Sequence, residues 1–243
     1  MKTIKILVAA IVIISFSSCK KDKEPDAPSY TCTTCKTVPD AVVANNSSSK
    51  GVYKGVIIGS TGTIMFDIAN NGTTITAIMV LDGVTVNLTS TVTWVAGQPF
   101  AAAFTGTLGG QPVSINFSVG ATGSTPTVTS SNIPGHASAS FNIIKETSLG
   151  LVECFEGTYN TTLPETGTFN IILSRTLATW SGVGRKTGST TTSTPGNGSI
   201  VSNNLIDPSQ NNRSIGTLNV DALNGSFMDS NGKTVTLTGK RTL

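Results

Sequence analysis

The chain has 243 residues, a formal net charge of +3 at pH 7 and only 12 % charged side chains. Few charges together with abundant glycine, threonine, serine and asparagine are typical of an extracytoplasmic all-β protein rather than of a helical one. Binding to nucleic acid would require a basic patch with interleaved aromatic residues. The sequence shows no such patch, so we expect no nucleic-acid partner.

The N-terminus has the parts of a secretory signal. Lys2 and Lys5 form a positively charged region, and residues 6–14 are nine consecutive apolar residues. Ser17 and Ser18 are small residues of the kind found before a cleavage site. Nine apolar residues are too few to span a bilayer, since a transmembrane helix needs roughly 20. No later apolar run approaches that length, so no transmembrane helix is expected.

Residues 16–19, Phe-Ser-Ser-Cys, resemble a bacterial lipobox, in which the cysteine is lipidated and becomes the new N-terminus. Phe16 departs from the usual leucine of that motif. The charged residues 20–24 resemble the start of Bacteroidota-type lipoproteins, where lysine and acidic residues after the cysteine direct export to the cell surface. This resemblance implies a signal peptide over residues 1–18 and an acylated Cys19 that anchors the protein in the outer membrane, on either the outer surface or the periplasmic face. The alternative is an ordinary cleaved signal with an incidental Cys19.

Several acyl chains on Cys19 would hold the protein at a lipid bilayer without a transmembrane helix, since each buried methylene contributes about 0.8 kcal/mol. Removal of residues 1–18 leaves 225 residues (243 − 18), enough for one large or two small domains. Residues 19–49 are polar and contain Pro25, Pro28 and Pro39 without a helical or strand period. Such a segment is typical of a flexible linker.

Three further cysteines follow Cys19: Cys32 and Cys35 form a Cys-Thr-Thr-Cys motif, and Cys154 lies far along the chain. In an oxidising envelope we expect a disulfide, either between Cys32 and Cys35 or from one of them to Cys154. A redox motif of this spacing usually begins a helix in a thioredoxin-like unit, whereas this one precedes the first strand. Lys36 stands where a c-type haem site needs histidine, and a second cysteine pair for zinc is absent. We therefore expect neither a cofactor nor a metal.

From Gly51 onward, apolar residues recur with period two, which predicts β-strands. The clearest strands of the first half are expected over residues 62–68, 73–80, 84–92, 100–108, 113–119 and 138–144. The turn signals between them are Asn71-Gly72, Asp82-Gly83, Gly109-Gly110 and Pro134-Gly135. No segment keeps a period of 3.6 residues, so essentially no helix is expected.

The same plan recurs in the second half of the chain. The matched segments are residues 51–55 with 156–160, 62–66 with 167–171, and 105–117 with 224–237. We interpret them as duplication of one module, with copies at residues 50–147 and 148–243. Each copy should be a meander of short antiparallel strands that closes into a small barrel or half-barrel, because closure removes exposed edges. The alternative is two small sandwiches.

The hairpins that carry Gly-Thr-Tyr and Gly-Thr-Phe, and the terminal residues 238–241, resemble a Gly/Thr-rich β-repeat of bacterial lipoproteins of unassigned role. That resemblance implies architecture only. Residues 186–204 are rich in threonine, serine, glycine and asparagine and contain Pro195. They predict a long loop, disordered rather than functional.

No motif in the chain specifies a reaction. His136 is the only histidine, and no Gly-x-Ser-x-Gly motif precedes a helix. The acidic residues do not form an obvious pair for glycoside hydrolysis. The run that begins at Asp229 resembles the start of a calcium loop but lacks the remaining ligands, so it predicts a hairpin turn. We therefore expect no catalytic residue and no enzymatic activity.

Exposed aromatic side chains would be the simplest sign of sugar binding. Trp94 lies beside the turn-like residues 97–99 and is the candidate ligand contact, while Trp180 lies in the middle of a predicted strand. The alternative for both is packing in a β core. Residues 56–144 contain no lysine or arginine. That neutral half indicates either divergence between the two modules or contact with a partner such as a neutral glycan.

The sequence thus favours a non-enzymatic, membrane-tethered envelope lipoprotein with a binding or structural role. Its partners would be the lipid bilayer, through acylated Cys19, and a glycan, an envelope protein or a small hydrophobic ligand held inside a barrel. The alternative is an envelope enzyme, either a hydrolase or a thiol oxidoreductase that uses Cys32 and Cys35.

Overall fold

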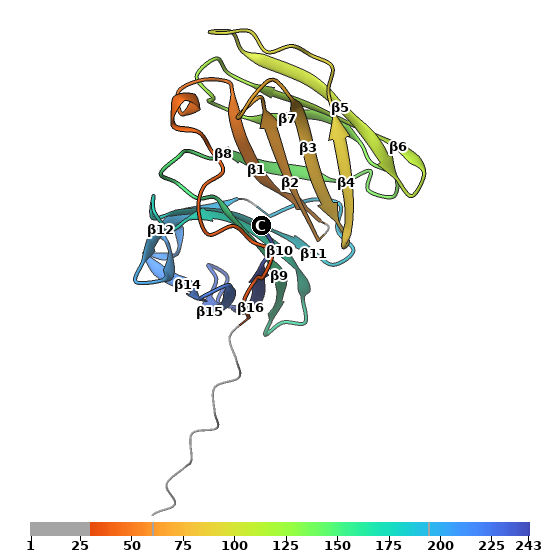
Figure 1. Ribbon diagram of the computed structural model, residues 1–243. Helices are drawn as coiled ribbons and strands as arrows, with labels where there is room; N and C mark the ends of the chain where they lie inside the picture. The colour runs from red at the N-terminus through yellow and green to blue at the C-terminus, as the bar shows by residue number, and fades with distance from the viewer. Residues whose placement is uncertain (1–29, 60, 194) are drawn as a thin grey trace, which may run out of the picture.

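The computed structural model describes residues 30–243 except residues 60 and 194. The predicted signal peptide, Cys19 and the first part of the predicted linker lie outside the described residues. The described part of the chain forms sixteen strands and two short 3₁₀ turns, η1 (Val43–Asn45) and η2 (Pro208–Gln210), without an α-helix (Figure 1). The prediction of an all-β fold is confirmed.

The first eight strands form one antiparallel sheet that curls into a nearly closed barrel, here called barrel 1. Its strands are β1 (Gly51–Ile58), β2 (Gly62–Ile68), β3 (Ile75–Leu81), β4 (Val84–Thr89), β5 (Phe100–Leu108), β6 (Gln111–Val119), β7 (Thr127–Asn132) and β8 (Ser140–Lys145). Successive strands pair as far as β7, and β8 returns to pair with β1. The edges β7 and β8 lie close together without pairing.

The last eight strands form a closed antiparallel barrel, here called barrel 2. Its strands are β9 (Glu153–Thr161), β10 (Thr166–Ser174), β11 (Thr179–Lys186), β12 (Gly196–Val201), β13 (Asn204–Asp207), β14 (Arg213–Asn219), β15 (Ala222–Met228) and β16 (Thr234–Arg241). β16 pairs with β9, which closes the ring. The barrel prediction is therefore confirmed, and the sandwich alternative is wrong.

Two segments differ from their predicted state. β7 was not predicted, because its sequence Thr-Val-Thr-Ser-Ser-Asn is mostly polar and exposed. Residues 186–204, predicted as a disordered loop, contain β12, which pairs with β11 and β13. Two of the interior-facing positions of β12, Gly196 and Gly198, carry glycine, so the usual period-two signal is weak there. The ladder hydrogen bonds to two neighbouring strands order this segment in place of hydrophobic burial.

The two barrels share a plan: each is an eight-stranded meander whose last strand pairs with its first. The individual sequence matches do not all follow it. Residues 105–117 belong to β5 and β6, the fifth and sixth strands of barrel 1, whereas residues 224–237 belong to β15 and β16, the seventh and eighth strands of barrel 2. Period-two β sequence rich in Gly and Thr matches many other strands equally well, which explains this offset.

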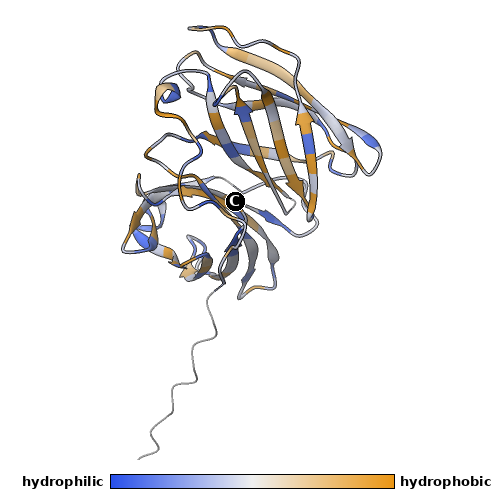
Figure 2. Cartoon of the chain, viewed as in Figure 1, coloured by the Kyte–Doolittle hydropathy of each residue, from blue (hydrophilic) through white to orange (hydrophobic). Residues whose placement is uncertain are grey.

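Barrel 1 is filled by its own side chains. Hydrophobic and hydrophilic residues alternate along its strands (Figure 2), and 21 buried hydrophobic residues form its core. The rings of Phe66 and Phe117 stack with centroids 4.3 Å apart, and Phe104 meets Phe66 edge-on at 4.9 Å. Aromatic pairs of this kind contribute about 0.5–1.5 kcal/mol beyond the area they bury. The core of barrel 2 has only 10 buried hydrophobic residues.

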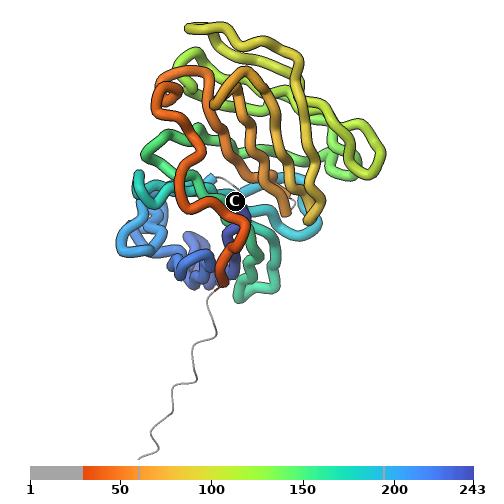
Figure 3. The backbone as a smooth tube through the Cα atoms, in the orientation of Figure 1, coloured from red at the N-terminus to blue at the C-terminus, as the bar shows by residue number. Residues whose placement is uncertain are grey.

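The barrels pack wall to wall through β1, as the chain trace shows (Figure 3). All eight residues of β1 are buried, because one face of the strand points into barrel 1 and the other points at barrel 2. Tyr53 and Ile57 belong to the core of barrel 1. Val56 and Ile58 pack instead with residues of barrel 2, including Ile172. Full burial of side chains of this size contributes about 1.5–3 kcal/mol each, so this contact joins the barrels firmly.

Residues 30–49, here called the N-terminal segment, lie against both barrels (Figure 3). The Cys32 amide donates to Asp221 of barrel 2 at 2.8 Å. On barrel 1, the Asn45 side chain donates to the Asn70 carbonyl at 2.8 Å. This part of the predicted linker is thus bound to the domains instead of separating them. Its sequence lacks an apolar period because polar side chains and backbone groups make the contacts.

A buried ion pair joins this segment to β1. The Lys54 ammonium lies 2.7 Å from Glu146 Oε2 and 3.1 Å from Asp40 Oδ2. Glu146 is fully buried and also accepts hydrogen bonds from the amides of Asp40 and Val152. Every charge in the cluster therefore has a partner, which is the condition under which buried charges are tolerated.

Replacement of Lys54 by methionine should reduce the free energy of unfolding by about 3–5 kcal/mol, because it leaves two carboxylates without their cation. Denaturant unfolding measures the change. The matched control is Lys36→Met: Lys36 pairs with the same Asp40 at 3.4 Å, but 64 % of its side chain is exposed. That change should cost less than about 1 kcal/mol. Equal losses in the two variants would contradict the structural role of the buried pair.

Candidate functional site

Barrel 2 contains a cavity of about 270 Å³. Four aromatic residues, one each from β9, β10, β11 and β15, contribute to its wall: Tyr159, Phe169, Trp180 and Phe227. Residues of the β9–β10 and β15–β16 turns, such as Glu165 and Asp229, also line it, which places its mouth at that end of the barrel. An eight-stranded barrel has an interior just wide enough for its own side chains or for one small ligand. Barrel 1 takes the first option, whereas barrel 2 leaves the space open.

Glycine occupies interior positions on two neighbouring strands that line the cavity. Gly182 and Gly184 of β11 and Gly196 of β12 line the cavity without a side chain to fill it. At Gly184 a methyl group would have its nearest neighbours at 3.6 Å, an ordinary contact distance, so the backbone there leaves real space. The equivalent volume of barrel 1 is occupied by aromatic rings.

Trp180 is the largest side chain of the cavity wall, and its position is fixed. The residue is 4 % exposed, and its indole Nε1 donates to the Ile206 carbonyl at 3.1 Å. The alternative that Trp180 is buried in a β core is confirmed. Its place on a cavity wall was missed. The signal available in the sequence was the alternation Trp180-x-Gly182-x-Gly184, which puts one large residue and two glycines on the same face of one strand.

Asp207, at the end of β13, brings a carboxylate to this cavity. Its Oδ1 accepts hydrogen bonds from the amide of Ser209 at 2.8 Å and from the Ser209 hydroxyl at 2.7 Å. These bonds cap η2 and fix the side chain. Among the described residues, Oδ2 has no hydrogen-bond partner. The cavity therefore combines a mostly apolar wall with a fixed acceptor at Asp207.

The mouth carries a small charged cluster centred on Glu165. Its carboxylate lies 3.3 Å from the Lys186 ammonium and 3.9 Å from Lys233, and accepts a hydrogen bond from the Tyr159 hydroxyl at 3.2 Å. The hydrogen bond with Lys186 is the main reason that the pKa of Glu165 is lowered. Glu165 is thus ionised and already paired, in contrast to the free oxygen of Asp207.

Trp94, the residue predicted as a ligand contact, is not part of this cavity. It is half-buried and packs against the core of barrel 1. Its indole Nε1 donates to the Ser49 hydroxyl at 2.8 Å, and the Lys50 ammonium lies 4.8 Å from the ring centroid. These contacts give Trp94 a packing role between barrel 1 and the N-terminal segment.

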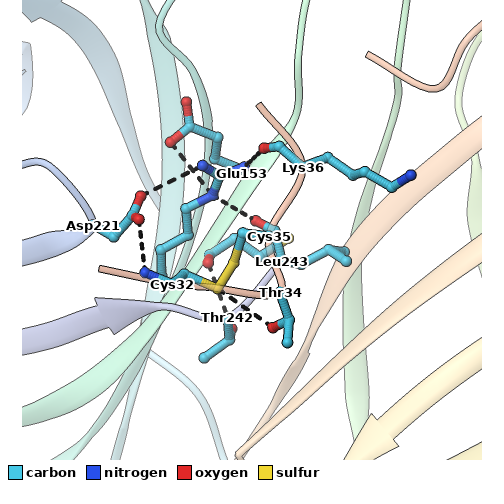
Figure 4. Close-up of a disulfide and its surroundings, with 10 residues drawn as sticks. Cys32, Thr34, Cys35, Lys36, Glu153, Asp221, Thr242 and Leu243 are labelled. Atoms are coloured by element: carbon cyan, nitrogen blue, oxygen red, sulfur yellow. Dashed lines mark hydrogen bonds and ion pairs between the residues drawn. A yellow bond between two sulfur atoms is a disulfide. The ribbon is translucent and has the colours of Figure 1, made fainter. Parts of the chain in front are cut away.

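The cysteines are arranged as one local disulfide and one buried thiol. Cys32 and Cys35 are bonded, with Cα atoms 5.4 Å apart, and the bridge lies beside Asp221, Thr242 and Leu243 (Figure 4). Of the two pairings considered from the sequence, the local one is present, and a bridge to Cys154 is absent. Cys154 is buried between the barrels, and burial raises the pKa of its thiol.

A second polar site lies where barrel 2 faces barrel 1. The Glu156 carboxylate is 8 % exposed and receives a hydrogen bond from the Gly62 amide of β2, yet its Oε1 has no partner. Asn170 of β10 lies directly opposite Glu156 of β9. It is also buried, and both of its side-chain polar atoms lack a hydrogen-bond partner. Burial raises the pKa of Glu156 to about 7. This site therefore binds a proton more tightly in the folded protein than in the unfolded chain.

The raised pKa makes stability depend on pH. Because the folded-state value of about 7 exceeds the ordinary 4.5, the free energy of unfolding should fall as pH rises between these values, by an amount of the order of 3 kcal/mol. Unfolding curves measured from pH 4 to pH 8 test this, and Glu156→Gln should flatten the dependence. Glu165→Gln is the control, because the pKa of Glu165 is lowered instead. An unchanged slope in Glu156→Gln would contradict this origin.

No protein-family model, curated protein or solved structure matches the chain. Among the described residues, no three His, Cys, Asp or Glu side chains come together as metal ligands. The same part of the chain has no helix long and apolar enough to cross a membrane. The function must therefore be inferred from the geometry of the barrels.

Proposed function

We propose that this protein is a membrane-tethered envelope lipoprotein that binds a small, mainly apolar molecule inside barrel 2. The observation that supports binding is the aromatic-lined cavity of about 270 Å³ in barrel 2. Barrel 1, in contrast, is filled by its own side chains. The sequence supports the tether, through the lipobox-like residues 16–19 and acylation of Cys19. In this proposal the protein captures or carries its ligand and does not transform it.

The expected affinity is moderate. Burial of a ten-carbon chain gains about 8 kcal/mol at 0.8 kcal/mol per methylene. Loss of translational and rotational freedom cancels part of that gain. Dissociation constants between about 1 μM and 1 mM are therefore expected for a simple aliphatic ligand, since 1 μM corresponds to about 8.2 kcal/mol. Tighter binding would need additional polar contacts.

Each barrel contains one tryptophan, so fluorescence reports on the barrels separately. Titration with 1-decanol should change the emission of Trp180 in a Trp94→Phe variant, because Trp180 lines the cavity. In a Trp180→Phe variant, where Trp94 is the only tryptophan, the emission should stay constant. Gly184→Leu should weaken binding at least about tenfold by filling the cavity, with Gly184→Ala intermediate. A response from Trp94 alone would contradict binding in barrel 2.

The tether proposal has a separate test in cells. Protease added to intact cells should degrade the protein if acylated Cys19 holds it on the outer surface. Replacement of Cys19 by serine should release the protein from the membrane fraction, since no acyl chain can then be attached. Resistance to protease until the outer membrane is permeabilised would place the protein on the periplasmic side instead.

A further inference from the structure

The cavity of barrel 2 has a polar feature that a purely apolar ligand would leave unused. Asp207 is 7 % exposed, and its Oδ2 is without a partner among the described residues although Oδ1 is held by Ser209. An ionised carboxylate only accepts hydrogen bonds. This oxygen can therefore accept a hydrogen bond from a ligand that brings a donor.

Trp180 and Asp207 converge on one point of the cavity. A methyl group built on Gly196 would lie 3.3 Å from the six-membered ring of Trp180 and 3.7 Å from Asp207 Oδ2. The ring and the carboxylate therefore lie close together on the cavity wall, on either side of Gly196. Indole rings attract cations, most strongly among the aromatic side chains. A carboxylate and an indole side by side on one cavity wall are two groups that attract an organic ammonium.

The other charges around the cavity agree with a cationic ligand. Three carboxylates contribute to its lining, from Glu165, Asp207 and Asp229, against a single ammonium, from Lys233. Lys233 is within 3.9 Å of Glu165 at the mouth. Arg213, opposite Asp207 in the β13–β14 register, is exposed and forms no ion pair with it among the described residues. The negative charge of Asp207 is thus left for the ligand.

We infer that barrel 2 selects amphiphilic amines, with the ammonium group between Asp207 and Trp180 and the apolar body along the aromatic wall. This inference rests on the proposed function and names its ligand class. A fatty acid of the same length would place a carboxylate near Asp207, which like-charge repulsion disfavours. A neutral alcohol would lack the charge-assisted hydrogen bond.

Three ten-carbon probes distinguish these cases: decylamine, 1-decanol and decanoate, each titrated at pH 7 below its micelle concentration. Trp180 emission in the Trp94→Phe background and isothermal calorimetry on the unaltered protein provide independent affinities. Decylamine should bind at least about tenfold more tightly than 1-decanol, as expected for a hydrogen bond to a charged group. Decanoate should bind most weakly.

Asp207→Asn is the decisive variant, because asparagine keeps the oxygen that accepts from Ser209 and removes the charge. It should lower the affinity for decylamine about tenfold or more and leave that for 1-decanol unchanged. Asp229→Asn is the matched control: it makes the same charge change at the mouth, where Asp229 already accepts from the amides of Asn231 and Lys233. It should retain the preference for the amine.

The outcomes separate this inference from the proposed function. Binding of 1-decanol without any preference for decylamine would overturn the amine selectivity and leave the binding role intact. Absence of binding by all three probes would overturn both. Equal loss of preference in the two aspartate variants would show that a general negative field, not Asp207, attracts the amine. The ranking of the probes on the unaltered protein remains a test even if Asp207→Asn fails to fold.

Discussion

Burial of β1 on both faces is the constraint on which the rest of the structure depends. A strand with one face in a barrel core normally exposes the other face to water, but β1 is buried at every position, and part of its outer face packs against barrel 2. A charged Lys54 in that strand can be buried only because Glu146 and Asp40 neutralise it. Asp40 comes from the N-terminal segment, so that segment, β1 and both barrels depend on one another for their charges and their packing.

The two barrels show how one architecture gives two interiors. Closure of eight strands leaves a narrow space that must be filled by side chains, water or a ligand. Phenylalanines fill it in barrel 1, whereas barrel 2 keeps a cavity, which Gly184 of β11 lines with space for a side chain. The second arrangement gives up packing energy of its own, and an apolar ligand could restore that energy on binding. The difference between the barrels is therefore the strongest structural argument for a binding role.

Much of the fold could be predicted from the sequence, because period-two alternation and Gly-containing turns are local signals. β7 and β12 were not predicted, because they contain few large apolar residues and are ordered by hydrogen bonds to the neighbouring strands. The ordered conformation of residues 30–49 was not predicted either, because it depends on hydrogen bonds to Asp221 and Asn70, which are far away in the sequence. The cavity depends on closure between β9 and β16 and on where Trp180, Gly184 and Asp207 meet in space. No local pattern contains that information, so Trp94, next to a visible turn, was the residue that the sequence favoured.

The end of barrel 2 that contacts the N-terminal segment is opposite to the mouth of the cavity. Tyr30, the first described residue, lies 5.7 Å from the Lys240 ammonium at the end of β16, and Cys32 bonds to Asp221, which directly precedes β15. The mouth is formed at the other ends of these strands, around Glu165 and Asp229. Strands of one barrel separate the two ends, so the contacts of the N-terminal segment on this barrel leave the mouth uncovered. The proposed entry of a ligand at the mouth therefore does not compete with the contacts that hold the N-terminal segment on barrel 2.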